Sequence, residues 1–88
     1  MSAASAVCAN IAEGFGRGSH ADFARFLIIA AGSLREVENY LTDIADRGYL
    51  SEVQLQAAFG LTDQTSAKLG GLIAYLRRTP TPTPRKRR

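Results

Sequence analysis

The chain has 88 residues, a hydrophobic fraction of 45%, one cysteine and no tryptophan. This length allows one small domain at most, and a single cysteine excludes both an intrachain disulfide and a multi-cysteine zinc site. The net charge of +3 is unevenly distributed, because residues 77–88 carry six basic and no acidic side chains, whereas residues 1–76 carry five basic and eight acidic ones. A basic tail on a mildly acidic body indicates a polyanionic partner.

The first expected element is a short alanine-rich helix over residues 2–13, with Val7, Ile11 and Cys8 on its inner face. Gly14 is expected just beyond the helix end, where a positive φ is common and glycine adopts it without steric cost. Phe15 would then pack under the helix end, and residues 16–18 would form the turn.

A long helix is expected from His20 to about Arg47. Ser19 is a suitable N-cap with Asp22 three residues on, and Gly48 marks the carboxyl end. Apolar residues alternate in steps of four and three along this segment, which predicts one helical face packed nearly parallel to neighbouring helices. They are Phe23, Leu27, Ala30, Leu34, Val37, Leu41 and Ile44.

A third helix is expected over residues 52–78, opened by a capping box of Ser51 and Gln54. Its apolar face, which runs from Leu55 to Leu76, is interrupted by a polar centre at residues 60–66 with low helix propensity. Gly70 and Gly71 add a further cost. We therefore expect either close packing at these two glycines or a bend near Thr62.

The sequence TPTPTP after Arg78 is incompatible with a helix and predicts an extended spacer that carries RKRR into solvent. The expected organisation is a helical domain over residues 1–78 and a disordered Thr/Pro-rich basic tail over residues 79–88. The expected fold class is all-α, an antiparallel helical bundle of a short and two long helices. The single cysteine, which allows no disulfide within the chain, favours a cytoplasmic location. Neither a signal peptide nor a membrane-spanning segment is recognisable.

One string of residues resembles a known family. The marks are the sequence NIAEG at residues 10–14, Gly16-Arg17, the sequence GSLRE at residues 32–36, and Gly48-Tyr49-Leu50. In this combination the chain resembles, over about residues 5–76, the small four-helix-bundle proteins encoded in intervening sequences of bacterial 23S rRNA genes. Accessory proteins of diversity-generating retroelements resemble it more distantly.

The resemblance implies an antiparallel four-helix bundle in the cytoplasm, with homopentamers known among family members and an association with RNA or another nucleic acid. Members usually carry a further amphipathic helix ahead of the NIAEG helix, whereas this sequence begins within the second helix. A misassigned start and a truncated variant both explain that difference. The basic tail lies outside the resemblance.

Unequal helix lengths predict self-association. A first helix of about 12 residues covers less than half of a partner of about 28 residues, so part of the long apolar face needs another cover. A second copy of the chain is the simplest one. The pentamer is favoured by the family resemblance, and a dimer that completes the bundle between two chains is the alternative.

Candidate catalytic, metal and cofactor sites all have simpler explanations. Cys8 is expected to be a buried small residue without a basic neighbour, and His20 an exposed residue in a helix first turn. The acidic residues from Glu36 to Asp46 are expected on a solvated face. The sequence GFGRGS lacks the strand and the Lys-Ser/Thr ending of a P-loop. We predict no enzyme activity, cofactor, metal or small-molecule substrate.

Two sets of residues are candidates for other roles. Asn10 and Glu13, and likewise Ser33 and Glu36, are polar pairs three residues apart, for which a structural hydrogen-bond network is favoured over contacts to a ligand or RNA. Arg17 either pairs with Glu13, which is favoured, or meets a phosphate. The residues expected to bind nucleic acid are Arg17, Arg77, Arg78, Arg85, Lys86, Arg87 and Arg88. A self-assembling protein-interaction module with no nucleic-acid role is the alternative function.

Overall fold

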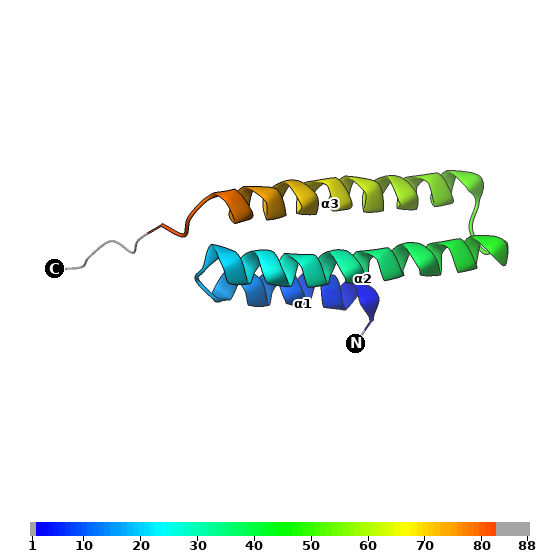
Figure 1. Ribbon diagram of the computed structural model, residues 1–88. Helices are drawn as coiled ribbons and strands as arrows, with labels where there is room; N and C mark the ends of the chain where they lie inside the picture. The colour runs from blue at the N-terminus through cyan, green and yellow to red at the C-terminus, as the bar shows by residue number, and fades with distance from the viewer. Residues whose placement is uncertain (1, 83–88) are drawn as a thin grey trace.

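The computed structural model describes residues 2–82, which form three α-helices: α1 (Ala3–Gly16), α2 (His20–Asp46) and α3 (Glu52–Arg78). Successive helices run antiparallel, and no strand occurs within these residues (Figure 1). The predicted all-α antiparallel bundle of a short and two long helices is therefore confirmed. None of the three helices is both long and apolar enough to cross a bilayer.

Local capping signals determine where the two long helices begin. The Ser19 hydroxyl accepts a hydrogen bond from the backbone N–H of Asp22, and Ser51 and Gln54 form a complete capping box. Such caps stabilise a helix by about 1 kcal/mol each. At the end of α2, Gly48 has a φ of +75° and its N–H bonds to the carbonyl of Ala45. These predicted boundaries are confirmed to within one residue.

The predicted end of the first helix is wrong. α1 continues through Gly14 to Gly16, and Gly18 instead takes the positive φ, of +83°. Gly14 is buried, and a Cβ there would lie 2.7 Å from the Cβ of Phe26. The glycine therefore lets α1 approach α2 closely instead of ending the helix. Phe15 does not pack under the helix end, since 75% of it is exposed.

The core lies along α2, which is the central helix. α1 and α3 each pack against α2 and not against each other. Leu27 and Ala30 of α2 are completely buried, and Leu34 is nearly so. The full set of buried hydrophobic residues is Val7, Ala24, Leu27, Ala30, Leu34, Leu69 and Leu76. The predicted apolar face of α2 supplies three of these residues, Leu27, Ala30 and Leu34, whereas Ala24 was not predicted and Phe23 is only partly buried.

Expectations for α3 were only partly correct. Thr62 is buried as the apolar face predicts, but α3 is one continuous helix without a visible bend there (Figure 1). Gly70 and Gly71 are exposed, and no other atom would lie within 4 Å of a Cβ at either position. Close packing at these glycines does not occur within residues 2–82. Tyr49 in the α2–α3 turn is also exposed.

The short helix α1 leaves the second half of α2 covered on one side only. Figure 1 shows α1 beside the amino-terminal part of α2, while α3 extends along its whole length. Leu41 and Ile44, which continue the apolar face of α2, are accordingly only partly buried. Cys8 is exposed on α1 instead of buried, because neither α2 nor α3 covers that face of the helix.

Beyond α3, residues 79–82 are not helical, as predicted for the Thr/Pro-rich spacer. Thr79 is extended, with φ −115° and ψ 118°, but it is partly buried against the start of α2. The predicted disorder of the remaining tail concerns residues 83–88, which lie outside the described residues.

Candidate nucleic-acid interface

Basic side chains from the α1–α2 turn, from α2 and from α3 lie at one end of the bundle. Because the helices are antiparallel, the α1–α2 turn and the last turn of α3 lie at the same end (Figure 1). We call this region the basic end and define it by Arg17, His20, Arg25, Arg77 and Arg78. Residues 79–82 leave the bundle here, so the candidate residue Arg17 lies at the same end as the adjacent candidates Arg77 and Arg78, which are far from it in sequence.

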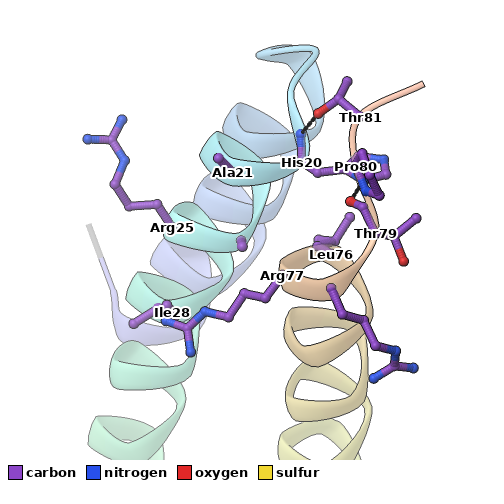
Figure 2. A pocket seen from close by; sticks show the side chains of 11 residues that line it. His20, Ala21, Arg25, Ile28, Leu76, Arg77, Thr79, Pro80 and Thr81 are labelled. Atoms are coloured by element: carbon purple, nitrogen blue, oxygen red, sulfur yellow. Dashed lines mark hydrogen bonds between the residues drawn. The ribbon is translucent and has the colours of Figure 1, made fainter. Parts of the chain in front are cut away.

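A groove of about 560 Å³ lies between the start of α2 and the end of α3. Its walls carry the cationic side chains of Arg25, Arg77 and Arg78, and residues 79–81 form one side. In Figure 2, Arg77 reaches from α3 towards α2, whereas Arg25 points away from α3. The groove therefore has one cation turned inwards and others along its edges.

His20 attaches the first residues after α3 to the start of α2. Its Nδ1 lies 2.7 Å from the carbonyl oxygen of Thr79, and its backbone N–H donates to the Thr81 hydroxyl at 2.8 Å (Figure 2). The expectation of an exposed first-turn histidine was wrong, because His20 is partly buried by this segment. No local signal reveals a contact between residues about 60 positions apart in the chain.

Two arginines of the basic end are fixed against one aromatic ring. The guanidinium carbons of Arg17 and Arg25 lie 5.1 Å and 5.4 Å from the ring centroid of Phe26, within the range of cation–π attraction. Arg17 also pairs with Glu13 at 3.1 Å, and Arg25 with Asp22 at 3.5 Å. The favoured pairing of Arg17 with Glu13 is present, and each carboxylate reduces the charge available to a ligand.

Arg77 and Arg78 differ, since neither forms an ion pair with any residue in 2–82. Both are exposed in the last turn of α3, where the helix dipole favours positive charge. They are therefore the cations of the basic end with the most charge available to an incoming anion.

The opposite end of the bundle is acidic. Residues 36–63, which surround the α2–α3 turn and which we call the acidic half, contain six of the eight acidic residues and one basic residue, Arg47. Arg47 pairs with Asp43 at 3.4 Å. A polyanion approaching this molecule is therefore attracted to one end and repelled from the other.

The polar residues considered for a structural network make local contacts. Asn10 donates from Nδ2 to the carbonyl of Ala6 at 2.8 Å, and Glu36 accepts from the Tyr40 hydroxyl at 3.2 Å. Glu13 bonds to Arg17, as described above, and Ser33 is partly buried. Side-chain hydrogen bonds within residues 2–82 do not join any two of Asn10, Glu13, Ser33 and Glu36, so a network among them stays a prediction.

A different polar contact joins two helices. The Thr62 hydroxyl of α3 lies 3.3 Å from Oε2 of Glu38 on α2 and 2.9 Å from the carbonyl of Phe59. Glu38 is partly buried and not fully solvated as expected for its face. This pair was not predicted from the sequence, although the polar Thr62 at an inward-facing position of α3 was a signal.

Residues 2–82 contain no group of three His, Cys, Asp or Glu side chains placed to hold a metal ion. The predicted nucleic-acid residues Arg85, Lys86, Arg87 and Arg88 lie outside the described residues. What the described part offers is therefore an exposed cationic surface built from arginines.

Comparison with known proteins gives one informative result. No curated protein and no solved structure matches the chain significantly. A family model described as "23S rRNA-intervening sequence protein" matches residues 1–71. The match includes α1, α2 and most of α3, and it stops before Arg77 and Arg78. It confirms the resemblance carried by the NIAEG and GSLRE segments, and because it covers most of the chain, the protein belongs to the family of 23S rRNA-intervening sequence proteins.

Proposed function

We propose that this protein is a non-enzymatic helical-bundle protein of the cytoplasm that self-associates and binds RNA or another nucleic acid through its basic end. The observation that carries this proposal is the convergence of Arg17, Arg25, Arg77 and Arg78 at the end of the bundle where residues 79–82 leave it. The tail that follows residue 82 adds four more basic residues to the sequence, Arg85, Lys86, Arg87 and Arg88.

Arginine is well suited to this role. Its planar guanidinium group is always charged and donates paired hydrogen bonds to phosphate oxygens. Arg77 and Arg78 have no carboxylate partner within residues 2–82, so phosphate contacts would not have to break an existing ion pair. The acidic half supplies the opposite potential and orients a polyanion towards the basic end.

The test is the salt dependence of RNA binding by the full chain. Replacing both Arg77 and Arg78 by alanine should lower the log–log salt slope by roughly 0.7–0.9 for each phosphate that the variant no longer neutralises. The matched control replaces Arg35 and Arg47 by alanine, which removes the same charge outside the basic end and should leave a larger slope. Equal slopes for the two double variants would contradict the proposed surface.

The tail is tested separately with a chain that ends at Arg78. This chain lacks four basic residues, and we expect weaker binding with a further decrease in salt slope. Since contacts of a flexible basic segment to phosphates carry no base specificity, the loss should be similar for different RNA sequences. Binding as tight as that of the full chain at low salt would remove the tail from the proposal.

Self-association is supported by apolar surface beside the second half of α2. A concavity of about 460 Å³ is lined there by Val37, Tyr40, Leu41 and Ile44, next to the amino end of α1. None of the three helices of the described part covers it, and another copy would bury these side chains. The favoured stoichiometry of five comes from resemblance to homopentameric family members, and a dimer is the alternative.

Analytical ultracentrifugation at micromolar concentration tests this part. We expect a homo-oligomer, and we expect Leu41→Glu to shift it towards monomer because a charge would be buried at the contact. Thr42→Glu adds the same charge one residue away, outside the concavity, and serves as the control. A stable wild-type monomer would contradict self-association, and a dimer would contradict only the number five.

The same concavity favours the second candidate function, a self-assembling protein-interaction module with no nucleic-acid role. Under this alternative the oligomer forms as described, but the full chain does not bind RNA even at low salt. Ultracentrifugation and RNA binding together therefore separate the candidates without further assumptions.

A further inference from the structure

Two exposed aromatic rings stand beside the cations of the basic end. Phe15, at the end of α1, is 75% exposed, and Tyr75, in the last turns of α3, is 48% exposed. They come from helices that do not pack against each other, yet both line one concavity of about 340 Å³. Its other walls include His20, Phe23, Leu72 and Leu76. The surface is largely apolar and lies at a charged end of the molecule.

Each of these two rings has another ring as a neighbour. Phe15 makes an edge-to-face contact with Phe23, with ring centroids 5.9 Å apart and an interplanar angle of 79°. The ring of Tyr75 lies 6.2 Å from that of His20. An aromatic side chain has only two side-chain torsions, so it loses little conformational freedom when a flat ligand stacks on it.

The aromatic concavity adjoins the basic groove. His20 and Leu76 line both, one from the start of α2 and the other from the end of α3. The arginines Arg25, Arg77 and Arg78 line the groove, and the rings of Phe15 and Tyr75 line the concavity. A ligand that contacts both the groove and the concavity therefore needs negative charge for the arginines and a flat, apolar face for the rings.

Nucleotides with unpaired bases have this combination of properties. In a duplex the bases are stacked within the helix and their faces are not available to protein side chains, whereas unpaired bases stack on aromatic rings. Resting on the proposed nucleic-acid function, we infer that the basic end binds single-stranded RNA, with phosphates at the arginines and a base stacked on Phe15 or Tyr75.

Charge distinguishes this surface from other exposed aromatics of the chain. Tyr49 is 73% exposed, but it lies in the acidic half, three residues in sequence from both Asp46 and Glu52. A polyanion is repelled there, so exposure of an aromatic ring alone does not make a nucleotide site. Tyr49→Ala is therefore a matched control: it removes an equally accessible ring without touching the basic end.

The experiment measures binding of the full chain to a single-stranded oligoadenylate, to the same strand paired with oligouridylate, and to an abasic strand of equal charge. We expect the single strand to bind most tightly at moderate salt. Phe15→Ala or Tyr75→Ala should weaken single-strand binding by roughly 5- to 100-fold, with little effect on the duplex and the abasic strand. Tyr49→Ala should change none of the three.

A second readout does not depend on removing a ring. The chain has no tryptophan and three tyrosines, so a variant with Tyr40→Phe and Tyr49→Phe has Tyr75 as its single tyrosine. Stacking of a base on Tyr75 should quench its fluorescence when the oligoadenylate is added and not when the abasic strand is added. Tyr75→Leu, which retains most of the apolar volume, replaces Tyr75→Ala if the alanine variant does not fold.

Distinct results overturn the two proposals. If none of the three strands binds at low salt, the nucleic-acid function itself is wrong. If all three bind equally and the ring variants behave as wild type, the phosphate surface is right and base stacking is wrong. Base stacking is also wrong if Phe15→Ala changes the oligomeric state while affinity for the oligoadenylate is unchanged, because the rings then belong to a contact between protein chains.

Discussion

The two halves of α2 carry the same apolar spacing in different surroundings. In the first half, Leu27 and Ala30 lie between α1 and α3 and are completely buried. In the second half, Leu41 and Ile44 have α3 on one side and the open concavity on the other, and they are only partly buried. An apolar pattern thus predicts which face of a helix is covered, while the length of the neighbouring helices decides how completely.

The largest expected effect is in the first half. Leu27→Ala removes a fully buried side chain and should lower the free energy of unfolding by about 2–5 kcal/mol. Leu41→Ala removes the same atoms from a partly exposed site and should cost less than about 2 kcal/mol within one chain. Urea unfolding at low protein concentration gives both values, and equal losses would show that the two halves of α2 do not differ.

A medium effect is expected at the contact between α1 and α2. Gly14→Ala would place a Cβ 2.7 Å from the Cβ of Phe26 and 3.1 Å from the ring of Phe23. Because two helix backbones would have to separate, we expect a loss of about 1–3 kcal/mol, measured as a lower midpoint of thermal unfolding. Gly16→Ala, where no atom is near, is the control. A stable Gly14→Ala variant would mean that Gly14 is not needed for close approach.

The smallest effect concerns the outer surface of α3. Gly71→Ala meets no atom within 4 Å and should stabilise the monomer by about 0.5–1 kcal/mol through better helix propensity. Thermal unfolding at several protein concentrations checks this value. A loss of stability that grows with concentration would show instead that another copy packs closely against Gly71 in the oligomer.

Features encoded by adjacent residues were predicted well from the sequence. Ser19, Gly48 and Ser51 mark helix ends through hydrogen bonds to residues at most three positions away, so their meaning is visible in a short window. The prediction for Gly14 was wrong for a physical reason. A glycine either adopts a positive φ at a helix end or allows another helix to pack closely, and only the position of Phe26 shows which of the two applies.

The candidate site was less predictable. The arginines could be identified by charge alone, and the antiparallel arrangement then brings Arg17 near Arg77 and Arg78. The attachment of Thr79 and Thr81 to His20, and the pairing of Thr62 with Glu38, depend on how α3 is positioned against α2. The exposure of Phe15 and Cys8 likewise depends on whether another helix packs against them, and the spacing of residues in the sequence does not show this.

The central position of α2 has a consequence for folding cooperativity. Because α1 and α3 do not contact each other, detachment of α3 leaves every contact between α1 and α2 intact. The α1–α2 hairpin forms from residues close in sequence, whereas α3, with its low-propensity centre, depends on docking to remain helical. Native-state hydrogen exchange should therefore reveal a partly unfolded form in which the amides of α3 exchange together while those at the α1–α2 contact remain protected.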